Sequence, residues 1–294
     1  MDCTVGGESV AKGKKLYSRV YLEITNICNM SCSFCHGTKR PKARMSLESF
    51  SQIAEQLREL TDYVYFHVLG EPLTHPALPC MIRRLSEMGI RSAVTTNGTL
   101  LPDRGDGLIE SGVYKVNISL HSFEDGSEES FLSYVDGVIN FAEKASERGI
   151  LVVMRLWNEG CDGGRNEKIL DILKARLPGE WIFGKRGARI RHRLHLEYGE
   201  RFEWPDINAC DLGDEAFCYG LGDHFGILSD GSVVPCCLDA EGDITLGNAL
   251  EKPLSDILSS ERAVAIREGF MRRRATERLC RRCGYSRRFS RENK

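Results

Sequence analysis

Apolar and polar residues follow two different spacings along the first two thirds of the chain. Runs rich in β-branched and aromatic residues predict strands at 19–25, 63–69, 91–96, 114–120 and 150–157, and a sixth within 188–198. Between these runs, apolar residues three and four apart predict helices over about 46–60, 77–88, 103–111, 130–148 and 167–176. Strands that alternate with helices predict βα units around a parallel sheet, which is an α/β fold.

Six βα units are too few for a closed eight-stranded barrel, and a doubly wound sheet would show the same alternation. In either architecture, ligands meet the loops that follow the carboxyl ends of the strands. The candidate residues at these ends are Gly70, Glu71, Asn97, Ser119, His121 and Arg155. We therefore expect them to surround one shared site.

The composition is that of an ordinary globular protein, with 294 residues, 41% hydrophobic and 28% charged. This length allows one large domain, or one domain and a smaller second one. The N-terminus lacks the basic and apolar regions of a signal peptide, and no run of about eighteen apolar residues occurs. The sequence therefore predicts a cytoplasmic protein that does not span a membrane.

Twelve cysteines are many for a cytoplasmic chain, and three of them fall within eight residues. Cys28, Cys32 and Cys35 form a CxxxCxxC pattern on the loop after the first predicted strand. Three thiolates on a four-iron cluster leave one iron open, and an open metal position can bind a small molecule. The alternatives are a zinc loop or unrelated buried thiols, but zinc sites prefer a distant second pair.

This triplet and its setting resemble the radical S-adenosylmethionine (radical SAM) superfamily. The resemblance implies a partial (β/α)6 TIM-like barrel in which the open iron of a 4Fe-4S cluster binds S-adenosyl-L-methionine. Reductive cleavage would then give a 5′-deoxyadenosyl radical, with flavodoxin or ferredoxin as the electron donor. Phe34, directly before the third Cys, matches the residue near the adenine.

The strand-end residues also match positions of this family. Leu69-Gly70-Glu71-Pro72 resembles the GGEP motif with its first Gly replaced, which implies contact between this turn and the methionine amino group. Asn97, Ser119 and Arg155 resemble residues near the ribose and carboxylate of the cofactor. His121 is either a neighbour of the cofactor, a substrate-side acid or base, or an ordinary loop residue.

A second group of cysteines lies in the last third of the chain. Asp230-Gly231 between apolar runs predicts a hairpin over 224–236. Four thiols around and after it are candidate metal ligands: Cys218, Cys236, Cys280 and Cys283. Cys237 could replace its neighbour, and Cys210 is a further candidate ligand or substrate-side thiol. Two Cys pairs with a long gap also suit a Cys₄ zinc site.

This region resembles the SPASM and twitch extensions of radical SAM enzymes, which hold auxiliary 4Fe-4S clusters. No further Cys follows Cys283, which favours the shorter twitch-like form with one auxiliary cluster. The resulting division is an N-terminal arm at 1–18, a core at 19–200 and an auxiliary domain at 201–294. A helix is also expected between the Cys pairs, ending near residue 273.

A fully ligated auxiliary cluster would act as an electron acceptor, which favours a two-electron oxidation or a cross-link. The substrate classes left open are a small molecule, a ribosomal peptide and an RNA such as tRNA. RNA would suit the segment 262–294, where twelve Arg and Lys against three Glu give +9, although solvated helix faces explain that charge as well. The non-enzymatic alternative is a zinc-binding interaction module.

Overall fold

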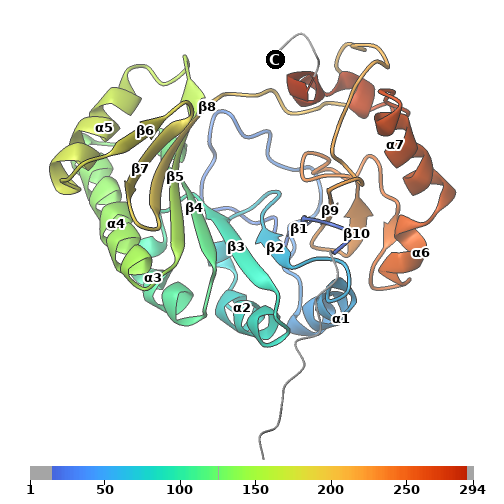
Figure 1. Cartoon of the computed structure of the whole chain (residues 1–294), viewed down its shortest axis with the longest axis horizontal. Helices are drawn as coiled ribbons and strands as arrows, with labels where there is room; N and C mark the ends of the chain where they lie inside the picture. Colours follow the sequence, from blue (N-terminus) through green and yellow to red (C-terminus); the bar gives the residue numbers. More distant parts are fainter. Residues whose placement is uncertain (1–14, 125, 290–294) are drawn as a thin grey trace, which may run out of the picture.

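The computed structural model describes residues 15–124 and 126–289, so most of the expected arm at 1–18 lies outside the described residues. One sheet has the strand order β11-β10-β9-β1-β2-β3-β4-β5-β8-β7-β6. The sheet curves into an open barrel wall, and α1 to α5 cover its outer face (Figure 1). A doubly wound sheet would carry helices on both faces, so the partial barrel is the architecture observed.

Six parallel strands form this wall, and five helices connect them. The strands are β1 Arg19–Leu22, β2 Tyr63–Phe66, β3 Arg91–Thr96, β4 Lys115–Ser119, β5 Leu151–Glu159 and β8 Leu194–Glu200. The helices are α1 Leu47–Leu57, α2 Leu78–Glu87, α3 Leu101–Glu110, α4 Glu128–Glu147 and α5 Arg165–Arg176. The predicted α/β order is thus confirmed.

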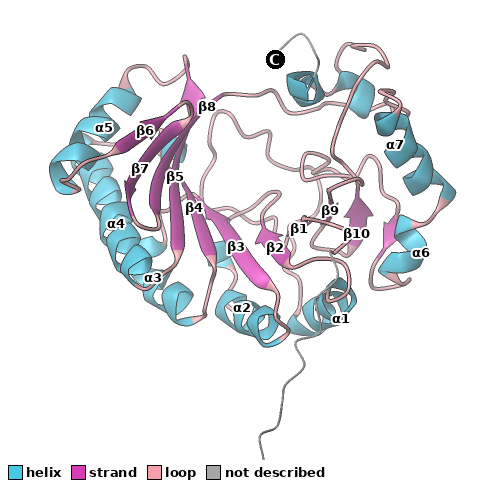
Figure 2. Ribbon diagram, viewed as in Figure 1, coloured by secondary structure: helices cyan, strands magenta, loops and turns pink. Residues whose placement is uncertain are grey.

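The helices bind the sheet through their apolar faces. In α1, Phe50, Ile53 and Leu57 are buried, and the Ser46 side chain accepts a hydrogen bond from the Ser49 amide at the helix start. Alternate strand residues, such as Val116 and Ile118 of β4, point outward into the same core. Their inward neighbours are therefore free to line the inside of the barrel. Figure 2 shows the helices on the outer side of the curved sheet.

The sixth predicted strand is in fact a hairpin. Strand β7, Gly187–Arg191, runs antiparallel to β8, and the short β6, Ile182–Gly184, pairs with β7 at the sheet edge. Gly187 has φ 145°, and a Cβ there would lie 2.0 Å from the Leu196 carbonyl oxygen, so only glycine allows this close pairing. Only β8 continues the parallel wall.

The predicted hairpin of the C-terminal region extends the same sheet. Strands β9 His224–Ile227 and β10 Ser232–Val234 are antiparallel, β11 Gly247–Asn248 follows at the edge, and β9 pairs in parallel with β1. The expected helix after it is two helices, α6 Leu254–Leu258 and α7 Glu261–Met271, because Ser260 starts a new cap between them. The pairing of β9 with β1 brings the second Cys group beside the barrel.

Among the described helices, none is both long and apolar enough to cross a membrane.

Candidate active site

A cavity of about 1060 Å³ fills the inside of the barrel and reaches the C-terminal cysteines. Fourteen of the sequence-predicted site residues line it: Cys28, Cys32, Phe34, Cys35, Gly70, Glu71, Asn97, Ser119, His121, Arg155, Cys218, Cys236, Cys280 and Cys283. Cys237 lines it as well, whereas Cys210 does not. Strand order explains the convergence of the first ten, since the loops after parallel strands meet at one edge of the sheet. The pairing of β9 with β1 brings the C-terminal region to the same cavity.

The three cysteines of the loop after β1 line this cavity at the carboxyl ends of the strands. The Cys35 amide donates to the Cys32 carbonyl oxygen at 3.1 Å, which makes a tight turn between the last two thiols. Burial, the carboxylate of Glu124 and the neighbouring thiols raise the pKa of Cys32 to about 11. Burial also raises the pKa of Cys28. These thiols form thiolates readily only beside a strong positive charge, such as iron.

Side chains from other strand ends hold this loop. Glu124, after β4, accepts hydrogen bonds from the Ser33 amide at 2.5 Å and from the Ser33 hydroxyl at 2.6 Å. The side-chain nitrogen Nδ2 of Asn97 lies 3.9 Å from the Cys28 sulfur. Glu124 was not predicted from the sequence, because one carboxylate in a loop carries no pattern.

The turn after β2 brings two backbone segments into contact. Gly70 has φ 75°, and a Cβ there would lie 2.3 Å from the Thr25 carbonyl oxygen. The buried Glu71 carboxylate accepts from the Leu73 amide at 3.0 Å and from the Asn97 amide at 2.7 Å. Burial raises the pKa of Glu71 to about 7. Glu71 thus joins the ends of β2 and β3, and its direct contact with a methionine amino group stays a prediction.

Replacing Glu71 with alanine leaves two buried amides without acceptors. We expect a loss of about 2 to 5 kcal/mol in stability, since each unsatisfied buried amide costs about 1–3 kcal/mol. The KM for S-adenosylmethionine should rise as well, because the loops that hold Asn97 and Gly70 lose their link. Thermal unfolding and cofactor-cleavage kinetics measure both effects. Glu87→Ala, at an exposed position of α2, is the matched control, and equal melting of the two variants would contradict this role.

The aromatic ring before the third cysteine packs on the predicted histidine. The ring centroids of Phe34 and His121 are 4.9 Å apart. His121 Nδ1 lies 3.0 Å from the Arg155 carbonyl oxygen and 3.3 Å from the Trp157 amide. Burial lowers the pKa of His121, so the imidazole is neutral at pH 7. Its ring is therefore placed as a neutral support for Phe34.

Arg155 and Ser119 lie side by side across β4 and β5. Arg155 Nε donates to a Glu197 carboxylate oxygen on β8 at 3.3 Å, and the guanidinium carbon lies 4.4 Å from the Trp157 ring centroid. Glu197 lines the cavity too and is a further residue that the sequence analysis missed. Glu197 lies within the predicted strand region 188–198. Its inward direction could be assigned only once this region was known to be a hairpin with Glu197 on β8.

The second group of thiols comes together from three segments. Cys218 precedes β9, Cys236 follows β10, and a short 3-10 helix at Cys280–Arg282 begins with Cys280 and is followed by Cys283. Burial raises the pKa of Cys236 and Cys280 well above the ordinary value, and the other thiols of the group raise it further. Cys237 instead lies against the Tyr21 hydroxyl of β1.

Four protein thiols are a donor set that an iron–sulfur cluster can take. All these cysteines are free of disulfides. Within residues 15–124 and 126–289, no three His, Cys, Asp or Glu side chains converge closely enough for a single metal ion. A four-iron cluster takes each thiolate on a different iron and so needs wider spacing than the four bonds of about 2.3 Å to one zinc.

The two adjacent cysteines give a direct test of this ligand set. We expect Cys236→Ser to lose about four irons per chain, because its sulfur faces the other three thiols. Cys237→Ser, which removes a thiol facing Tyr21, should keep them. Iron and sulfide content after anaerobic reconstitution, with the spectrum of the reduced clusters, measures the difference. The reverse result would assign the ligand to Cys237.

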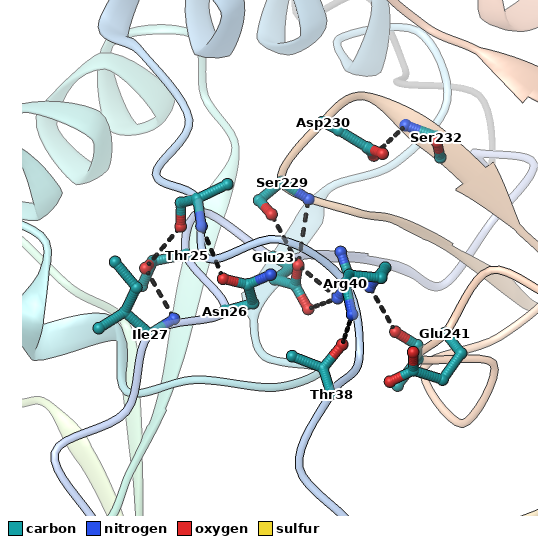
Figure 3. Close-up of polar contacts among 12 residues, drawn as sticks. Glu23, Thr25, Asn26, Ile27, Thr38, Arg40, Ser229, Asp230, Ser232 and Glu241 are labelled. Atoms are coloured by element: carbon teal, nitrogen blue, oxygen red, sulfur yellow. Dashed lines mark hydrogen bonds and ion pairs between the residues drawn. The ribbon is translucent and has the colours of Figure 1, made fainter.

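A buried ion pair fastens the segment after the first Cys loop to the C-terminal hairpin (Figure 3). Arg40 donates to both carboxylate oxygens of Glu23, at 2.8 and 2.7 Å, and also to the Ala240 carbonyl oxygen at 2.8 Å. Ser229, in the turn between β9 and β10, donates to the same carboxylate through its amide and its hydroxyl. These contacts therefore link the segment after the first Cys loop to the hairpin that carries part of the second Cys group.

Comparison with known proteins agrees with this geometry. Residues 22–158 match the radical SAM superfamily, and residues 218–284 match the iron-sulfur cluster-binding domain SPASM. A probable GTP 3′,8-cyclase of Archaeoglobus fulgidus is 32% identical over 265 residues, which are 77% of this chain and 88% of the relative.

Two solved structures show the same fold at lower identity. BtrN in complex with AdoMet and 2-DOIA has a TM-score of 0.61 at 21% identity, over 92% of this chain and 94% of that one. The anSMEcpe structure with bound AdoMet has a TM-score of 0.59 at 14% identity, over 86% of this chain and 83% of that one. The chain belongs to the radical SAM superfamily. More particularly, it is a radical SAM enzyme with a C-terminal SPASM-type iron–sulfur region.

Proposed function

We propose that this enzyme oxidises a small polar substrate by two electrons inside the barrel cavity. The observation that supports this is that four thiols of the C-terminal region line the same cavity: Cys218, Cys236, Cys280 and Cys283. Four protein ligands leave no open iron for a substrate, so one auxiliary cluster at this place suits electron transfer. When bound, the first cluster and S-adenosylmethionine supply a 5′-deoxyadenosyl radical that abstracts hydrogen from the substrate.

The side chains of this protein hold and orient the reactants. Cys28, Cys32 and Cys35 would bind the first cluster, with Glu124 and Asn97 fixing their loop. Phe34, supported by the neutral His121, offers a ring face for the adenine. Arg155 and Glu197 stand deeper in the cavity, where a substrate can exchange hydrogen bonds with them. The barrel wall around the cavity limits the contact of bulk water with a reactive radical.

The ion pairs of the C-terminal segment favour a small substrate over RNA, because they neutralise part of the positive charge of this segment. Several of its arginines already pair with acidic residues: Arg274 with Asp214, and Arg281 and Arg282 with Asp211. Arg262 pairs with Glu277 within the segment itself. A flavodoxin or ferredoxin remains the proposed electron donor.

The proposal is tested with purified, anaerobically reconstituted enzyme, S-adenosylmethionine and a panel of small alcohols and amines. A product that has lost two hydrogens, with 5′-deoxyadenosine formed in step, supports the oxidation. Substrate that stays at its starting oxidation level under cofactor cleavage contradicts it.

A second candidate is cyclisation of GTP, which the 32% identity to the probable GTP 3′,8-cyclase favours. The same assay separates the two candidates, because cyclisation within one molecule leaves its mass unchanged. A GTP-derived product of unchanged mass supports this candidate. A panel substrate that loses two hydrogens while GTP is untouched excludes it.

A further inference from the structure

The floor of the barrel cavity carries positive charge that the protein does not neutralise. Strand alternation turns Lys115, Asn117 and Ser119 of β4 inward, while Val116 and Ile118 pack outward. The inward residues of the neighbouring strands continue this floor: Arg19, Tyr65, Arg155 and Glu197. Lys115 is the first residue of its strand, so it stands at the end opposite the Cys loops.

The Lys115 ammonium has no hydrogen bond or ion pair with any residue in the described part of the chain. The two nearby arginines differ from it, because Arg19 is paired with Asp223 at 3.0 Å and Arg155 with Glu197 at 3.3 Å. Burial and the positive charge of Arg155 lower the pKa of Lys115, the Glu197 carboxylate opposes this shift in part, and Arg19 lowers the pKa further. A half-buried ammonium beside two other cations is unfavourable unless an anion joins them.

The histidines at this level do not supply that anion and add no charge. His67 lines the cavity wall against the Tyr21 ring, and the loss of solvation there lowers its pKa to about 4. Burial also lowers the pKa of His224. Both rings are neutral at pH 7. Because each of the two arginines has an acidic partner, Lys115 is the cation of this group without a salt bridge among the described residues.

A second observation comes from the next inward residue of the same strand. Asn117 is fully buried and lines the cavity, and its Nδ2 donates to the Thr95 hydroxyl at 3.3 Å. Its Oδ1 is buried without a hydrogen-bond partner among the described residues. A buried carbonyl oxygen without a hydrogen-bond partner is unfavourable, and a donor would stabilise it. The open space next to Asn117 is the cavity.

We propose that Lys115 and Asn117 form a substrate subsite that takes an anionic group together with a neighbouring hydroxyl or amine. The anionic group, a phosphate ester or a carboxylate, pairs with Lys115, and the hydroxyl or amine donates to Asn117 Oδ1. Because Lys115 is at the opposite end of β4 from the Cys loops, this subsite directs the rest of the substrate toward the cofactor. The inference rests on the proposed function and adds the substrate class to it.

The test measures anion binding to the reconstituted enzyme saturated with S-adenosylmethionine, so that the carboxylate of the cofactor does not compete. Inorganic phosphate and malonate are the probes, titrated by calorimetry at low and high salt. We expect saturable binding of at least one probe, which distinguishes a phosphate from a carboxylate site, and weaker binding at high salt. Lys115→Met should weaken it roughly tenfold or more, the effect of losing a hydrogen bond to a charged group.

Two further variants make the result specific. Lys115→Arg keeps the charge and should retain most of the binding. Lys174→Met removes an exposed cation of α5 and should bind like wild type. No saturable binding of either probe by wild type, or equal affinity in Lys115→Met, overturns the subsite. The loss of two hydrogens from a panel substrate in the same samples reports separately on the proposed function, so either idea can fail alone.

Discussion

Cys28→Ala is expected to reduce the formation of 5′-deoxyadenosine below detection while the chain stays folded. The Cys28 sulfur lies 3.9 Å from the Asn97 side-chain nitrogen Nδ2 in the cavity, and Cys28, Cys32 and Cys35 are the proposed protein ligands of the first cluster. Without one of them the cluster is lost, and the cofactor loses its electron source. Iron should fall from about eight to about four per chain, since the auxiliary thiols are untouched.

The matched control for this variant is Cys80→Ala. Cys80 is an exposed thiol on α2, away from the cavity, and its sulfur only accepts a hydrogen bond from Arg83. It should keep both the iron content and the cofactor cleavage of wild type. Cleavage at the wild-type rate by Cys28→Ala would refute the assignment of the first cluster.

The parts of the fold that follow from local patterns were predictable from the sequence. Strand β3, for instance, matches its predicted bounds, because a buried parallel strand is a short apolar run that ends at Asn97-Gly98. The CxxxCxxC loop is equally local, since its chemistry lies within eight residues. The strand-end rule then placed Glu71, Ser119 and Arg155 at the same cavity.

The features that the sequence did not reveal depend on contacts between distant segments. Ser229 and Glu23 are 206 residues apart, and no periodicity announces their hydrogen bonds or the pairing of β9 with β1. The choice between Cys236 and Cys237 was open for a related reason. The two cysteines lie in the bend and turn that follow β10, and the direction of each thiol depends on the course of that turn, which no local pattern in the sequence specifies.

Arg40→Ala is expected to cause the largest loss of stability. Its partner Glu23 has a side chain that is 0% exposed, so the variant leaves an uncompensated carboxylate in the interior. Breaking a buried pair in this way costs about 3–5 kcal/mol. For a chain of this size, the thermal midpoint should fall by about 10 °C. The exposed pair of Lys144 and Asp106 is the control, where Lys144→Ala should cost about 1 kcal/mol or less.

A double variant separates the lost charge balance from lost packing. Glu23→Leu with Arg40→Leu removes both charges and should recover part of the stability that Arg40→Ala loses, since a buried pair can be replaced by apolar side chains at little cost. The recovery should be incomplete, because the Ser229 amide and the Ala240 carbonyl oxygen lose their partners. If Arg40→Ala melts like Lys144→Ala, the ion pair does not hold the two Cys regions together.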